Sequence, residues 1–272
     1  MFLLPFILLY EYGTFRINTD VLNQSQIRVV AFVWLQNFLE SVGFHGKFAW
    51  AAPPLAVIVI LLSLQITSRK QWTFWTYDYG LMIIECVLLA IPLIVLTLLL
   101  STIGSRYLPK NTDGNTVAVQ AWSVPTCSSV DGNQNMDSSN GARNIYGNAR
   151  PWLANIVTGI GAGIYEELVF RLILICVLMV LFQDIFKMTH INAVVLSVLI
   201  SAALFSAHHH FDFFSGRPNE VDPFDITEFA FRTIAGIYFA ILYAIRGFGI
   251  TAGTHAFYNI IAETIRVSFS TQ

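Results

Sequence analysis

The sequence predicts an all-α protein, a polytopic transmembrane helix bundle with about six to seven spans. Hydrophobic residues make up 55% of the chain and charged residues only 12%, about half the charged fraction of an ordinary soluble domain. The mean hydropathy is +0.61. Helices are expected because lipid offers no hydrogen-bond partners, so each spanning segment must satisfy its own backbone. The net charge of −2 gives no indication of a nucleic-acid partner.

Six apolar runs reach the length of a membrane-crossing helix, which needs about 20 residues. A further amphipathic stretch, residues 27–42, either lies in the interface or completes another helix with the apolar N-terminus. The six runs cover residues 48–66, 81–104, 155–182, 191–211, 225–246 and 249–267.

A polar segment divides these runs into two groups. Residues 109–150 are rich in Asn, Ser, Gly and Asp and hold few large apolar side chains. Such a composition buries too little surface to offset the entropy of ordering, so we expect a flexible loop. The predicted organisation is an N-terminal block of membrane helices at 1–108, the loop, and a C-terminal helical block at 151–272.

Ionisable residues inside the apolar runs are concentrated in the C-terminal block. A charged side chain at mid-bilayer costs about 2.5–3.5 kcal/mol on insertion scales, so such residues usually face a protein interior and mark function. The two N-terminal runs contain only Glu85. The C-terminal block contains Glu166, Glu167, Arg171, His208, His209, His210, Arg232, His255 and Glu263. This asymmetry predicts a functional site.

Two adjacent glutamates stand in the third run. Glu167 and Arg171 are four residues apart, so they share a helix face, with the acid on the N-terminal side as an ion pair prefers. Glu166 lies about 100° round the helix and is not neutralised by that pair. One carboxylate is then held by arginine while its neighbour remains available for chemistry. An interhelical salt bridge with a spare glutamate is the structural alternative.

Two further polar faces occur in later runs. Phe205 and His209 are four residues apart, as are His255 and Asn259, so each pair shares a helix face. The histidines on either side of His209 are expected to point elsewhere, because three consecutive helical residues cannot all line one pocket. An interfacial histidine, or an asparagine that joins two helices, would explain either motif taken alone. Three such faces in one block favour a common site.

With these motifs the sequence resembles the CPBP family of intramembrane, metal-independent glutamic proteases, which comprises CAAX prenyl proteases and bacteriocin-processing enzymes. The family pattern is Glu-Glu-x-x-x-Arg, then Phe-x-x-x-His, then His-x-x-x-Asn or Asp, each on a separate helix. All three motifs occur here in order within residues 155–265, as Glu166-Glu167-x-x-x-Arg171, Phe205-x-x-x-His209 and His255-x-x-x-Asn259. One departure is Leu172, where relatives often have glycine.

The resemblance implies catalytic roles for four residues. Glu166 would act as general base on a water, helped by His209. His255 and Asn259 would donate hydrogen bonds to the developing oxyanion. The run of three histidines leaves the register of the second motif ambiguous, so His208 is the fallback for His209.

The resemblance also implies supporting residues and partners. Glu167 would pair with Arg171 and brace the helix, with Phe205 as the aromatic member of the second motif. The implied activity is that of a CAAX-type intramembrane endopeptidase that needs no metal or other cofactor. Its partners would be the bilayer and a membrane-associated peptide or protein, prenylated or not. The brevity of the chain favours a bacterial inner membrane.

Three alternatives remain open at this point. Glutamates and histidines are also zinc ligands, so a zinc-dependent membrane metallopeptidase is the runner-up, although no His-Glu-x-x-His motif occurs. A transporter would use the same residues as a proton relay. A non-catalytic relative would bind a membrane partner or confer immunity. Outside the motifs, Arg232 is expected to pair with Glu263 or a substrate carboxylate, or to snorkel from its helix.

Overall fold

The computed structural model describes residues 2–19, 30–43, 51–67, 76–107, 151–212, 217–218 and 224–270, and nearly all of them are helical. The N-terminal helices are α1 (Leu4–Thr19), α2 (Val30–Ser41), α3 (Ala52–Thr67) and α4 (Thr76–Tyr107). The C-terminal elements are α7 (Pro151–Glu167), η2 (Leu168–Leu174), α8 (Ile175–Met179), η3 (Val180–Ile185), α9 (His190–His210), β1 (Phe211–Asp212), β2 (Arg217–Pro218), α10 (Ile226–Arg246) and α11 (Phe248–Ser270).

Four helical stretches in the described part of the chain are long and apolar enough to cross a membrane. They are Tyr77–Leu100, Leu153–Ile185, His190–His210 and Ile226–Arg246, and each overlaps a predicted span. Helix α3 is apolar but shorter, and α11 does not reach this apolarity although it has 23 residues. The predicted count of six to seven spans therefore stays a prediction beyond these four.

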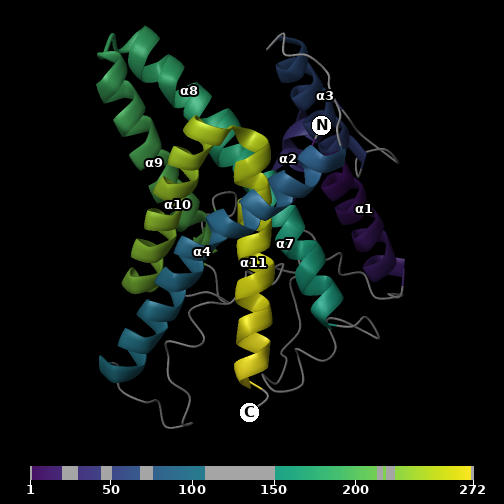
Figure 1. The fold of residues 1–272 in the computed structure, drawn as a ribbon. Helices are drawn as coiled ribbons and strands as arrows, with labels where there is room; N and C mark the ends of the chain where they lie inside the picture. Colours follow the sequence, from purple (N-terminus) through teal and green to yellow (C-terminus); the bar gives the residue numbers. More distant parts are fainter. Residues whose placement is uncertain are drawn as a thin grey trace.

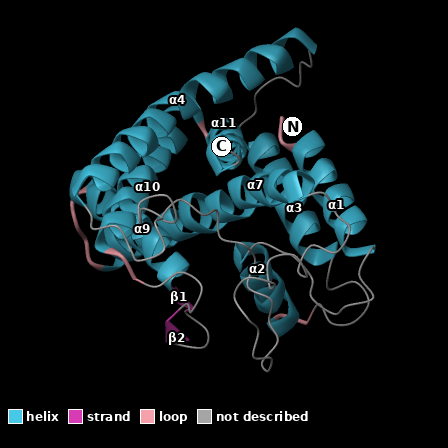
Figure 2. Cartoon of the chain, turned by 90° about the horizontal axis from the view of Figure 1, so that it is seen from below, coloured by secondary structure: helices cyan, strands magenta, loops and turns pink. Residues whose placement is uncertain are grey.

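The helices are arranged around α11, which runs through the middle of the molecule (Figure 1). Helices α9 and α10 pack side by side on one side of it, and α1 to α3 lie on the other. Figure 2 shows α11 end-on, with α7 and α4 passing on opposite sides of it. Helices from both predicted blocks thus pack together, because α1 contacts α7 and α4 contacts α11. The predicted loop at 109–150 lies outside the described residues.

Glycines allow α7 to approach its neighbours closely. A Cβ on Gly163 would lie 2.6 Å from the backbone oxygen of Ala252 on α11, and one on Gly159 would lie 3.3 Å from the Cβ of Asn259. Small residues at such positions let membrane helices pack backbone to backbone. On another face of α7, Gly161 makes room for the ring of Tyr10 from α1. Helix α7 is therefore held between α11 and α1.

The long helix that begins with α7 changes its winding where the glutamates end. Residues Leu168–Leu174 and Val180–Ile185 are π-helical, with the α-helical segment α8 between them. π-Helical insertions within α-helices are frequent at functional sites. The chain then reverses at Lys187, whose φ is 54°, and enters α9. This reversal brings the end of α9 back toward the glutamates.

Candidate active site

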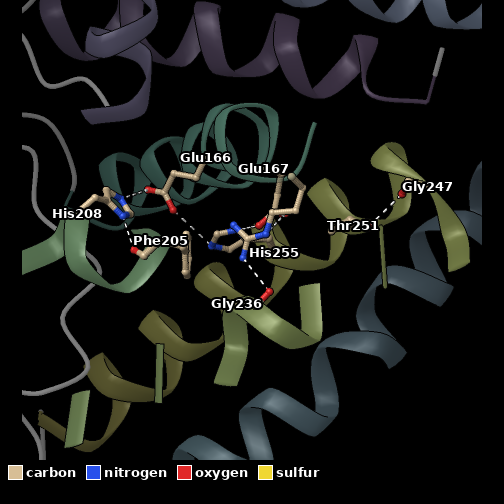
Figure 3. A network of polar contacts seen from close by, with 9 residues as sticks. Glu166, Glu167, Phe205, His208, Gly236, Gly247, Thr251 and His255 are labelled. Carbon is tan, nitrogen blue, oxygen red and sulfur yellow. Dashed lines mark hydrogen bonds and ion pairs between the residues drawn. The ribbon is translucent and has the colours of Figure 1, made fainter. Parts of the chain in front are cut away.

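The three sequence motifs meet between α7, α9 and α11, with α10 beside them (Figure 3). Glu166 and Glu167 are the last two residues of α7, directly before the π-helical segment η2. His208 and His209 lie at the C-terminal end of α9, and His255 lies on α11. All five side chains belong to buried residues. Ionisable groups in such a place need partners, since an unpaired buried charge is costly.

Glu167 is bound by two cationic or hydrogen-bonding partners. One carboxylate oxygen, Oε2, lies 3.1 Å from Nε of Arg171, and the other, Oε1, lies 2.7 Å from Nδ1 of His255. The side chains of Glu167 and Arg171 are 0% and 1% exposed. The predicted ion pair is therefore confirmed, and the bond to His255 is an addition that links the first motif to the third.

Arg171 makes further contacts, one of them with Phe205 of the second motif, that residue spacing alone did not indicate. Its guanidinium carbon lies 4.2 Å from the ring centroid of Phe205 and 5.5 Å from that of Phe239. Its Nη2 donates to the backbone oxygen of Gly236 on α10 at 3.4 Å. A cation between aromatic faces is stabilised electrostatically. Phe239 also stacks on the imidazole of His255 at 4.6 Å, so one ring supports two charged or polar partners of Glu167.

Glu166 faces two histidines without touching either closely. Its Oε1 lies 3.9 Å from Nε2 of His208, and its Oε2 lies 3.9 Å from Nε2 of His255 (Figure 3). Both distances exceed a direct hydrogen bond, yet one small group can bridge atoms at this separation. Glu166 is only 3% exposed. Two neighbouring glutamates thus have different surroundings, as the sequence predicted.

The run of histidines departs from the expectation in one respect. His208 does not point away: it is in ion-pair range of Glu166, while His209 lies beside it with the two ring centroids 3.9 Å apart. Adjacent helical residues diverge by about 100°, which is small enough for two of them to flank a group lying between them. His210 does turn away, toward α10, where its Nε2 lies 3.4 Å from Nη1 of Arg232.

The ring of Phe205 contacts three of the histidines in the cluster. Its ring lies 5.5 Å from those of His208 and His209 and 5.9 Å from that of His255. The contacts with His209 and His255 are edge-to-face, a favourable geometry for aromatic pairs. The predicted second motif is therefore placed against the third.

Asn259 lies one turn beyond His255 on α11 and is 8% exposed. Its Cβ is next to Gly159, so the absence of a side chain there leaves it room. One turn further, Glu263 accepts a hydrogen bond from Nδ2 of Asn155 at 2.8 Å. Arg232 pairs with Glu228, on its own helix, at 3.3 Å. The expected pairing of Arg232 with Glu263 or a substrate carboxylate stays a prediction.

Glu166, His208 and His209 also form the one group of three potential metal ligands found among the described residues. Their ligand atoms lie within 4.8 Å of one another. One carboxylate and two imidazoles are a ligand set that catalytic zinc accepts. Bonds of about 2.0–2.2 Å to zinc would require these atoms to come closer together.

One aromatic residue of the N-terminal block reaches the cluster. Trp34 of α2 makes an edge-to-face contact with His208, at 5.6 Å between ring centroids, and lies 6.2 Å from Phe170. The amphipathic pattern of residues 27–42 predicted a helix, and α2 at Val30–Ser41 confirms that this stretch is helical. Nothing in the sequence linked that helix to the three motifs.

Residues 148–261 match the model of the Rce1-like type II CAAX prenyl endopeptidase family. This C-terminal part of the chain is therefore similar to that family. The match supports a CAAX-type intramembrane peptidase and an integral membrane protein, which agrees with the apolar helices of the chain. No curated protein and no solved structure matches the chain. The matched region contains Glu166, His209 and His255 and excludes Trp34.

Proposed function

We propose that this CAAX-type peptidase hydrolyses a peptide bond in a membrane-associated peptide or protein, with Glu166 as the general base on a water. The observation that carries the proposal is the division between the two glutamates. Both oxygens of Glu167 are engaged, by Arg171 and His255, whereas those of Glu166 face histidine nitrogens at 3.9 Å. A base must keep an oxygen within reach of a reacting group. Glu166 meets that requirement and Glu167 does not.

His255 is the donor that we assign to the oxyanion. Its Nδ1 donates to Glu167, which fixes the ring and directs Nε2 toward Glu166. A second proton, on Nε2, would be the one that His255 donates to the oxyanion. A carboxylate that orients a histidine and stabilises its charged form is a recurring arrangement in hydrolases. Asn259, one turn further along α11, supplies the second donor through its amide.

The proposed reaction needs no covalent intermediate. The water oxygen attacks the scissile carbonyl carbon while Glu166 takes the proton, and the carbonyl oxygen becomes an anion held by His255 and Asn259. Donors fixed around an oxyanion in a site of low dielectric stabilise the tetrahedral intermediate strongly. The C–N bond then breaks as the protonated Glu166 returns the proton to the leaving nitrogen. His209, with His208 beside it, positions Glu166.

A zinc peptidase is the second candidate, and the grouping of Glu166 with His208 and His209 is the observation that favours it. These three residues would hold the ion, which would supply Lewis-acid activation of water. We prefer the metal-free mechanism because the potential ligand atoms of Glu166, His208 and His209 would have to come closer together to bind zinc. We propose that no cofactor is required.

The test is cleavage of a quenched fluorogenic library of membrane peptides by the protein purified in detergent. Wild type, Glu166→Gln and His209→Ala are compared, each with and without a strong zinc chelator. Cleavage by wild type that survives chelation and is lost in both variants supports the proposal. Activity that disappears on chelation and returns with zinc establishes the metalloenzyme. Unchanged cleavage by Glu166→Gln rejects Glu166 as the base.

We also propose further membrane spans beyond the four candidate spans, and a membrane in which the protein resides. Helix α11 has 23 residues and packs among those spans, so we count it as a fifth. Helix α3, together with the N-terminal helices α1 and α2, would bring the total to six or seven. We place the protein in a bacterial inner membrane, where its substrate would also reside.

A further inference from the structure

A buried polar contact joins α7 and α11 at some distance from the glutamate–histidine cluster. Nδ2 of Asn155 donates to Oε1 of Glu263 at 2.8 Å, and Glu263 is only 6% exposed. A carboxyl group inside an apolar bundle is costly, so a residue of this kind usually has a role there. None of the proposed catalytic steps uses either residue, and Glu263 follows the end of the family match at residue 261.

The same two helices also meet at the cluster, where Oε1 of Glu167 and Nδ1 of His255 lie 2.7 Å apart. Asn155 stands about three turns before Glu167 on α7. On α11 the order is reversed, because Glu263 follows His255 by about two turns. The two helices are therefore antiparallel, with one polar contact toward each end of their interface. Figures 1 and 2 both show α7 beside α11.

Between the two polar contacts, glycines of α7 face α11. A Cβ on Gly159 would lie 3.3 Å from the Cβ of Asn259, and one on Gly163 would lie 2.6 Å from the backbone oxygen of Ala252. Glycines let the helices approach closely, but they have no side chain to oppose sliding of one helix along the other. A buried polar pair does specify register, because another register leaves a polar group without its partner. The two polar contacts are thus suited to fixing the register of α7 against α11.

Register matters to the proposed site because its parts come from both helices. Glu166 is on α7, whereas His255 and Asn259 are on α11. Nε2 of His255 lies 3.9 Å from Oε2 of Glu166. A slide of one residue moves a helix by about 1.5 Å. A misplacement of about 1 Å between reacting groups can lower a rate by about 10²-fold.

We propose that Asn155 and Glu263 are positioning residues, whose hydrogen bond sets the register of α7 against α11. The pair acts through the two helices and so places His255 and Asn259 opposite Glu166. This inference rests on the proposed function, because that function assigns the oxyanion donors to α11 and the base to α7.

The test is the double variant Asn155→Leu/Glu263→Leu, in which both polar groups become apolar side chains of similar size. Apolar replacement of both partners of a buried hydrogen bond is often nearly neutral, so the unfolding midpoint should stay near that of wild type. We expect kcat on a peptide cleaved from the library to fall by about 10- to 100-fold, with KM little changed. Asn155→Ala, which removes only the donor from a partly buried position, should lower kcat by a smaller factor.

Two further variants separate register from stability. Glu263→Gln can still accept the hydrogen bond from Asn155, so it should retain most of the wild-type kcat. Tyr238→Phe is the control, because it removes a hydrogen bond between two other helices, from Tyr238 of α10 to the backbone oxygen of Leu89 on α4 at 2.6 Å. It should keep the wild-type kcat. A double leucine variant with wild-type kcat would overturn the inference, as would an equal loss of kcat in Tyr238→Phe.

The register itself is measured by a cross-link that needs no activity. In Gly159→Cys/Asn259→Cys the two Cβ atoms would lie 3.3 Å apart, close to the spacing in a disulfide. Oxidation should therefore join α7 to α11, and mass spectrometry of the digested protein gives the cross-linked fraction. That fraction should fall when the two leucines are added and stay high with Glu263→Gln. A fall supports the role of the pair even if Glu166 proves not to be the base, and an unchanged fraction would overturn it.

Discussion

Two of the glutamate–arginine pairs in the described residues share their chemistry and differ in their surroundings. Glu167 and Arg171 are 0% and 1% exposed, between α7, α10 and α11. Glu85 and Arg246 join α4 to the end of α10 at 2.5 Å, with 28% and 49% of their side chains exposed. The exposed pair has the shorter contact, yet we expect the loss of one member of the buried pair to lower the free energy of unfolding more. Burial, rather than distance, decides what such a pair contributes.

The buried pair is part of a larger network. Arg171 also contacts Phe205, Phe239 and the backbone of Gly236, and Glu167 also binds His255. Loss of one member leaves a charge without its partner in a region that water does not reach. The exposed pair connects two helices at the surface of the protein, where each charge has other ways to be solvated. The comparison predicts that equivalent substitutions at the two pairs will differ widely in effect.

The largest effect is expected from Arg171→Met, which leaves the Glu167 carboxylate buried without its cation. We expect the free energy of unfolding in detergent to fall by about 3–5 kcal/mol. The double variant Glu167→Gln/Arg171→Met removes both charges, so it should recover a large part of that loss. Denaturant unfolding of the two variants and wild type measures this, and equal stability of the single variant and wild type would break the comparison.

A smaller effect is expected where α7 touches α11. In Gly163→Ala the new Cβ would meet backbone atoms of Ala252 and Ala256 at 2.6 and 2.7 Å, and a backbone cannot easily give way. We expect a loss of about 1–3 kcal/mol in the same unfolding measurement, as for other overpacked sites. Gly80→Ala on α4 is the matched control, because its Cβ meets nothing within 4 Å. A Gly163→Ala protein as stable as Gly80→Ala would show that the two helices separate readily.

The smallest effect is expected from Arg246→Gln. Its guanidinium is half exposed, so the loss of the contact with Glu85 should change unfolding little. The unfolding midpoint of this variant should lie far closer to wild type than that of Arg171→Met. If the two variants were equally destabilised, burial would not be what separates the pairs.

Much of the helical architecture was predictable because apolar length is a strong signal. The run at 225–246 corresponds to α10 at Ile226–Arg246, and the run at 191–211 to α9 at His190–His210. The Glu167–Arg171 pair was predictable for a similar reason, since residues four apart in a helix are neighbours before any tertiary contact forms.

The rest of the site depends on contacts between helices that spacing cannot reveal. Phe239 supports Arg171 and His255 from α10, and Trp34 reaches His208 from α2. Both are ordinary aromatic residues in apolar helices, so no local pattern sets them apart. The approach of His208 to Glu166 likewise depends on where α9 ends relative to α7. The predicted catalytic roles remain predictions, since geometry alone does not establish chemistry.

The most direct test of the division between the two glutamates is to measure kcat and the unfolding midpoint of Glu166→Gln and Glu167→Gln side by side. We expect kcat of Glu166→Gln to fall by about 10²- to 10⁴-fold while its unfolding midpoint stays near that of wild type. Glu167→Gln should lose stability as well as activity, because its carboxylate binds both Arg171 and His255. A Glu166→Gln protein that cleaves at the wild-type rate would contradict the assignment of Glu166 as the base.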